Sequence, residues 1–103
     1  AMSSEGTWRV WDPTKQAWAG SSVACPVPTA NVWHHLTWEF ERNSSNQLVF
    51  DAVTLDGNRG VVNMIEAHQS DSSNGLDVSM QMDAKDGPIL YSVWLDKISL
   101  TYW

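Results

Sequence analysis

The 103-residue sequence contains a single cysteine, Cys25, so no disulfide can form within the chain. We expect this thiol to act as a small, half-buried hydrophobic group, because unpaired cysteines are among the most buried residue types. A reactive thiol, or a partner cysteine in a longer parent protein, is the alternative. Pairing therefore gives no information on the redox compartment.

Positive charge is also scarce. Six Lys and Arg residues stand against twelve Asp and Glu, which gives a formal net charge of −6, and the basic residues do not cluster. Nucleic acids and anionic membranes need such clusters, so we expect neither as a partner. No apolar run reaches the roughly 20 residues of a membrane span, and no basic region followed by an apolar one opens the chain. We expect a soluble domain.

Helical periodicity is missing as well. No window of eleven or more residues combines an apolar 3.6-residue repeat with helix caps. Short alternating runs occur instead, with turn signals about every 8–12 residues, as in sandwiches and barrels. The sequence therefore predicts an all-β fold, an antiparallel β-sandwich of six to eight strands with little or no helix.

The predicted strands follow from the alternation and from the turn residues between them. A hairpin spans 7–18 around the turn Asp12-Pro13-Thr14-Lys15, and a crossing loop with Gly, Ser and Pro follows over 20–31. Strands are then expected at 33–42, 47–55, 61–65, 76–83 and 89–103, separated by a polar turn at 43–46, a turn at 56–60, a loop at 66–75 and a turn at 83–88.

The domain organisation is simple. Ala1-Met2-Ser3-Ser4 is typical of an expression-vector remnant, so residues 1–6 are expected to be vector-derived or disordered. Residues 7–103 are expected to form one β-sandwich domain, because a chain of this size builds one hydrophobic core.

Tryptophan is the unusual feature, with seven residues in 103, several times the ordinary number. An exposed indole offers a flat apolar face to the C–H face of a sugar ring, while nearby polar groups bind the hydroxyls. Alternation assigns Trp38 and Trp94 to the core. The candidates for sugar stacking are Trp8, Trp11, Trp18, Trp33 and Trp103. The alternative is that most of these five fill the core or a dimer seam.

Three other constellations are candidates for chemistry. Glu39 and Glu41 lie on one strand face about 6.5–7 Å apart, a geometry that serves glycoside hydrolysis, but a solvated strand face is the preferred explanation and we expect no catalysis. His34 and His35 are adjacent and so point to opposite faces, which disfavours a zinc site. Oxygen ligands with a spacing suited to calcium are supplied by Asp56, Asn58, the Gly60 carbonyl, Asp83 and Asp86, although tight turns explain the same residues.

A family resemblance adds to this interpretation. The segment Tyr91–Trp103 resembles the closing strand of jelly-roll carbohydrate-recognition domains. Together with Trp33–Trp38 and Leu48–Gly57, it resembles the C-terminal part of a concanavalin A-like lectin/glucanase sandwich. Retaining glucanases of that class carry Glu-x-Asp-x-x-Glu, whereas this chain has Asn43 and Ser44 at the end of the corresponding stretch.

The resemblance implies a module of a larger secreted protein, extracellular or at the cell surface, that binds carbohydrate without catalysis. Complete domains of the family are about twice as long, so this chain would be part of one, and its exposed strand edges predict a homodimer formed through sheet edges or strand exchange. The alternatives are a structural or association module without a ligand and a remnant glycoside hydrolase.

Overall fold

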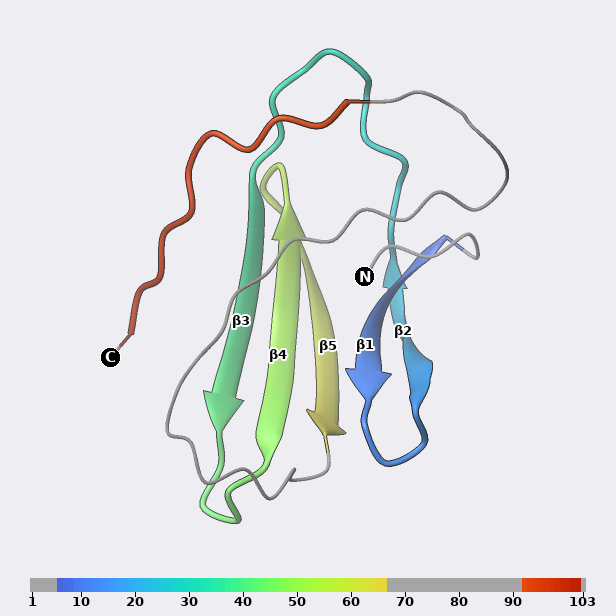
Figure 1. The fold of residues 1–103 in the computed structure, drawn as a ribbon, viewed down its shortest axis with the longest axis vertical. Helices are drawn as coiled ribbons and strands as arrows, with labels where there is room; N and C mark the ends of the chain where they lie inside the picture. The colour runs from blue at the N-terminus through green and yellow to red at the C-terminus, as the bar shows by residue number, and fades with distance from the viewer. Residues whose placement is uncertain (1–5, 67–91, 103) are drawn as a thin grey trace. The chain divides into compact units, whose positions relative to one another are not determined.

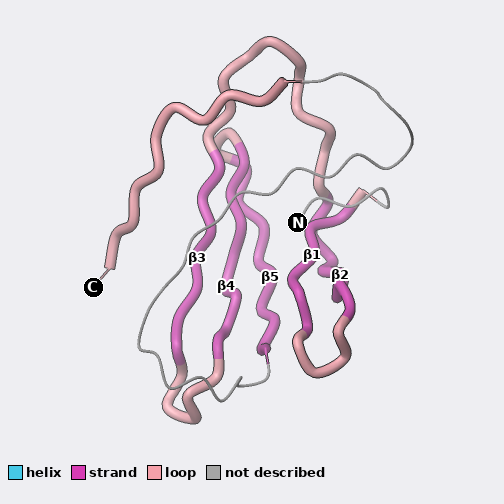
Figure 2. The backbone as a smooth tube through the Cα atoms, viewed as in Figure 1, coloured by secondary structure: helices cyan, strands magenta, loops and turns pink. Residues whose placement is uncertain are grey.

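The structure is a computed structural model that describes residues 6–66 and 92–102 (Figure 1). The chain divides into two compact units, Ala1–Ser72 and Ser73–Trp103. The described residues contain no helix, and all of their strand pairs are antiparallel (Figure 2), which confirms the all-β prediction. The strands within 6–66 and 92–102 are β1 (Thr7–Asp12), β2 (Ala17–Ala24), β3 (Leu36–Arg42), β4 (Leu48–Leu55) and β5 (Asn58–Glu66).

Strands β1 and β2 form a two-stranded sheet, and the expected turn connects them. The Asp12 carboxylate accepts hydrogen bonds from the backbone N–H groups of Thr14 and Lys15, both at 3.0 Å, and its second oxygen lies 3.0 Å from the Lys15 ammonium. Such side-chain capping is why Asp opens turns of this kind. The bonds from Lys15 hold the pKa of Asp12 below its ordinary value.

β2 is longer than the sequence predicts, because 20–24 continues the strand and only 25–35 crosses over. The expectation of a loop from Gly20 was wrong. The pairing with β1 shifts register between Thr7 and Arg9, and Ser21 compensates with its side chain. Its hydroxyl donates to the Trp8 carbonyl at 2.8 Å and accepts from the Val23 N–H at 3.2 Å. A short polar side chain thus supplements the ladder where the backbone register is irregular.

The second sheet has the order β3-β4-β5 (Figure 1). Its two turns lie close to their predicted places, but the last turn is shorter: Asp56 and Gly57, with φ of 49° and 83°, form a two-residue hairpin loop, and Leu55 already pairs with Asn58. Positive φ at both central positions is the geometry that Asp-Gly favours. Strand β3 begins at Leu36 rather than at the predicted Trp33.

The two sheets share one core within the first unit. Trp8 of β1, Cys25, Val53 of β4 and Val62 of β5 are buried together, and Trp38 packs against them. The core roles expected for Cys25 and Trp38 are therefore confirmed, and burial raises the pKa of the Cys25 thiol. We call the side of β3-β4-β5 that carries these core residues the inner face.

Residues 92–102 do not form the predicted strand. Trp94, expected in the core, is 72 % exposed. Alternation makes a strand only where a neighbour completes the hydrogen-bonded ladder, and the described strand pairs do not include this segment. The predicted loop at 67–75, the strand at 76–83 and the turn at 83–88 lie outside the described residues.

Candidate functional site

The hairpin carries a pair of exposed indoles. Trp11 and Trp18 are direct cross-strand partners, and their ring centroids lie 5.4 Å apart with the planes at 73°. They are 45 % and 48 % exposed, whereas Trp8 and Val10 on the opposite face of β1 are buried. Because strand side chains alternate, burial of one face leaves the other to solvent. The hairpin therefore holds two aromatic faces next to each other at the surface.

The other predicted stacking residues do not join this pair. Trp8 is only 4 % exposed and meets Trp38 edge-on at 5.6 Å, so its indole belongs to the core and not to an open stacking face. Trp33 is 69 % exposed on the crossing loop. Trp103 lies outside the described residues. Of the five candidates, the structure brings Trp11 and Trp18 together.

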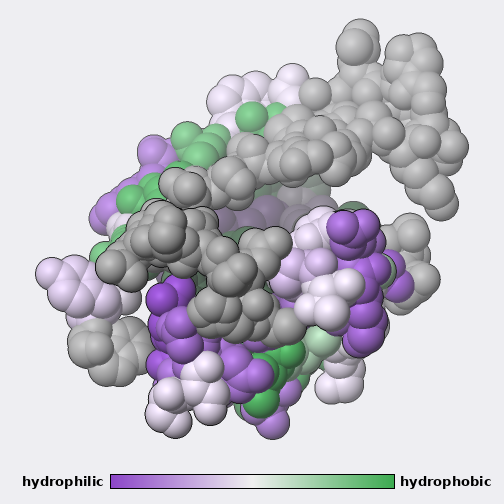
Figure 3. All heavy atoms as spheres, turned by 60° about the horizontal axis from the view of Figure 1, so that its bottom comes forward, coloured by the Kyte–Doolittle hydropathy of each residue, from purple (hydrophilic) through white to green (hydrophobic). Residues whose placement is uncertain are grey.

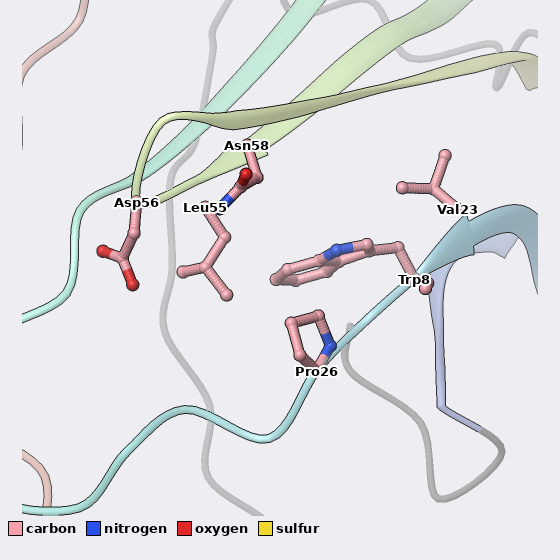
Figure 4. Close-up of a pocket in the computed structure, with 7 residues that line it drawn as sticks. Trp8, Val23, Pro26, Leu55, Asp56 and Asn58 are labelled. Atoms are coloured by element: carbon pink, nitrogen blue, oxygen red, sulfur yellow. The ribbon is translucent and has the colours of Figure 1, made fainter.

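A pocket of about 290 Å³ lies beside Trp8. Figure 4 shows the indole above Pro26, with Leu55 standing between the indole and Asp56. The remaining lining comes from Val23, Ala24 and Asn58. The pocket is mainly apolar, and its volume is at the lower limit of ordinary ligand sites, roughly 300–1,000 Å³.

His34 connects the crossing loop to the β4–β5 turn next to this pocket, and we call its contacts with Thr29 and Asp56 the clasp. His34 Nδ1 lies 2.6 Å from Asp56 Oδ2, and His34 Nε2 lies 2.8 Å from the Thr29 carbonyl oxygen. Both partners are acceptors, so both ring nitrogens must donate, which only the imidazolium can do. The Thr29 and Asp56 bonds raise the pKa of His34, and the His34 bond lowers the pKa of Asp56.

This clasp argues against calcium at Asp56 and Asn58. The second Asp56 oxygen accepts from the His35 backbone N–H at 2.8 Å, so both carboxylate oxygens have partners and one of these is a cation. A divalent ion there would meet the positive charge of His34. No cluster of three or more His, Cys, Asp or Glu side chains suited to a metal occurs within 6–66 and 92–102. Asp83 and Asp86 lie outside the described residues.

Glu39, one of the two carboxylates considered for hydrolysis, forms an ion pair. Arg59 donates from Nε to Glu39 Oε1 at 2.8 Å and from a terminal nitrogen to Oε2 at 2.7 Å, a bidentate ion pair across the sheet. These bonds lower the pKa of Glu39. A general acid needs a raised pKa, so Glu39 is unsuited to that role, and Glu41 is an exposed strand residue.

Sequence reasoning missed Glu66, which it placed in a loop. The residue ends β5 on the inner face and is only 6 % exposed, and its Oε2 atom has no hydrogen-bond partner among the described residues. Burial, and secondarily the charge of Asp12, raises the pKa of Glu66. Alternation could have predicted this burial, because Glu66 continues the pattern of Val62 and Met64, which lie in or against the core.

Comparison of the chain with protein-family models, with curated proteins and with solved structures finds no match. Within the described residues, no helix is long and apolar enough to cross a membrane.

Proposed function

We propose that this domain binds carbohydrate, without catalysis, on the hairpin face that presents Trp11 and Trp18. The observation that carries the proposal is the exposure of two directly paired indoles, each about half accessible to solvent. Large apolar side chains are normally buried, so two adjacent exposed rings on one hairpin need a reason. Stacking on the C–H face of a sugar ring supplies one.

The angle between the rings limits the ligand. At 73° the two indoles form a corner rather than a flat platform. One ring stacks on a pyranose face while the other flanks its edge, which suits a single or terminal sugar residue better than a flat polysaccharide chain.

The resemblance to lectin sandwiches also suggests a parent protein. We place the chain with concanavalin A-like, jelly-roll lectin domains, in an extracellular or cell-surface parent protein. Support comes from the all-β architecture and from two antiparallel sheets that share one core.

The test is a glycan-array screen, followed by titration calorimetry with the best ligand. The matched variants are Trp11→Ala, Trp18→Ala and, as the control, Trp33→Ala, which removes an exposed indole away from the hairpin. We expect each hairpin variant to weaken binding at least tenfold and the control to bind as the wild type does.

Circular dichroism separates loss of the site from loss of the fold, because an unfolded variant loses its β spectrum. Wild-type protein that binds no glycan would contradict the proposal and leave a structural module without a ligand. Equal loss in the Trp33 control would move the site to the crossing loop.

A further inference from the structure

The turn between β3 and β4 contains a motif that is a substrate for a covalent modification. Residues 43–45 read Asn-Ser-Ser, which fits the pattern Asn-x-Ser/Thr with x other than proline. Enzymes of the secretory pathway attach oligosaccharides to the asparagine of this pattern where it lies in a surface loop. No other asparagine of the chain has a Ser or Thr two residues later. Asn43 is therefore the one position where the sequence permits N-linked attachment.

The turn lies at the surface of the first unit. It connects the ends of β3 and β4 at the bottom of Figure 1, and Ser44, Ser45 and Asn46 are exposed. Figure 3 brings this end of the sheet forward, and hydrophilic surface is prominent there among the described residues. The buried core residues of the described chain lie outside the turn, so a bulky group attached here leaves the core packing intact.

The hydrogen bonds of the turn explain Asn43 but not the hydroxyl at position 45. Asn43 Oδ1 accepts from the backbone N–H groups of Ser45 at 3.0 Å and Gln47 at 2.9 Å. Ser45 contributes only this N–H, and its hydroxyl has no hydrogen-bond partner among the described residues. The turn therefore does not require a serine at position 45, whereas the acceptor motif requires a hydroxyl there.

The folded turn also has room for the modified side chain in its hydrogen bonding. Asn43 Nδ2 carries two hydrogens, and its bond to Gln47 Oε1, at 3.1 Å, uses one of them. Attachment of a sugar replaces one hydrogen and keeps the other. The amide oxygen is unchanged, so both bonds that Oδ1 accepts remain.

We propose that Asn43 carries an N-linked oligosaccharide, transferred as the chain passes through a secretory compartment. In the transfer, a bond forms between Asn43 Nδ2 and C1 of the first sugar, and the bond from C1 to the diphosphate of a lipid-linked oligosaccharide breaks. The displaced proton passes to the released lipid diphosphate. The proposal rests on the extracellular or cell-surface setting of the proposed function and not on sugar binding at Trp11 and Trp18.

The test is expression of the whole chain behind a secretion signal in yeast, followed by mass spectrometry of the secreted protein. We expect a single oligosaccharide on the wild type, removed by an endoglycosidase that leaves the first sugar on Asn43. Ser45→Ala should lose the added mass, although its backbone N–H still donates to Asn43. The matched control is Ser44→Ala, which changes an exposed serine of the same turn but keeps the motif and the added mass. Secreted wild type without added mass overturns the proposal, as does added mass that survives Ser45→Ala.

Two further comparisons separate this proposal from sugar binding and from a general effect on the fold. Protein made in the bacterial cytosol lacks the oligosaccharide and serves for the glycan-array screen, so a failure of sugar binding at the hairpin leaves the mass result untouched. Secreted wild type and secreted Ser45→Ala should unfold at the same urea concentration, because the hydrogen bonds of the turn survive in both. A much lower midpoint for the wild type would show that the folded turn does not accommodate the sugar and would overturn the proposal.

Discussion

At Gly60 the two sheets come so close that a side chain does not fit. A Cβ atom at this position would overlap the Val23 side chain of β2, whose Cγ2 would lie 3.1 Å away and whose Cγ1 would be closer still. A larger residue at position 60 therefore forces the Val23 side chain, or the hairpin that carries it, to move.

We expect Gly60→Ala to lower the free energy of unfolding by about 1–3 kcal/mol, the usual range for overpacking a core. Urea denaturation followed by far-UV circular dichroism measures it. Gly20→Ala is the matched control: its added Cβ would meet only ordinary contacts, 3.8 Å from Thr7 and 3.9 Å from Arg9, so stability should hardly change. Equal stability of the two variants would show that the sheets are less closely packed than the structure places them.

Residue roles were predictable where local alternation decides them. The alternation correctly put Trp38 in the core. It could also have told buried Trp8 from exposed Trp11, because residues three apart lie on opposite faces of β1. It did not contain the clasp of His34, Thr29 and Asp56, because those groups come from the crossing loop and from a turn more than 20 residues away.

At the scale of elements, the β1–β2 turn contains one favourable and one strained residue. Asp12 caps the turn through two backbone N–H groups, while Gln16 has φ of 50°, in the left-handed region. Asp12→Ala should lower the thermal midpoint because both capping bonds are lost. Gln16→Gly should raise the free energy of unfolding by up to about 1 kcal/mol, since glycine adopts that conformation without a Cβ clash.

We expect the two substitutions to change stability in opposite directions. Thermal unfolding and urea titration measure both changes. Thr14→Ala is the control. Thr14 donates to Asp12 through its backbone, so the bond survives the change. A Gln16→Gly variant less stable than the wild type would mean that the turn does not hold residue 16 in the left-handed region.

Elements were predictable in proportion to how local their causes are. Neighbouring residues are enough to predict the hairpin turn, the all-β class and the central residues of β3, β4 and β5. The irregularities do not: Asp51 lies at register shifts toward both β3 and β5, and Asn63 has positive φ within β5. For residues 92–102, the alternation indicates a propensity for a strand, but a strand also needs a neighbouring strand to pair with.

For the whole molecule, the shifted carboxyl and imidazole groups give stability a definite pH dependence. Folding lowers the pKa of Asp12, Glu39 and Asp56, so their contributions are present above about pH 4 and are lost as pH falls through the lower folded values. Folding raises the pKa of Glu66 and His34. Their contributions are complete below the unfolded values, about 4.3 and 6.5, and are lost as pH rises through the folded values.

The lowered carboxyls contribute fully above about pH 4 and the loss from Glu66 begins near pH 4.3, so maximum stability lies in the acidic range, between about pH 4 and 5. We therefore expect the thermal midpoint, followed by circular dichroism from pH 3 to 9, to pass through a maximum there and to fall by pH 8. His34→Gln should remove the part of the fall that lies above about pH 6.5, and Glu66→Gln the part that begins near pH 4.3.

His35→Gln is the control for this pH dependence, because His35 donates to Asp56 through its backbone and the substitution keeps that bond. Its alkaline fall should match that of the wild type. A wild-type midpoint that climbs steadily from pH 5 to pH 8 would contradict both assignments. It would mean that His34 does not hold the loop as an imidazolium and that Glu66 is hydrated in solution, so the crossing loop would be fastened to the sheet by something other than charge.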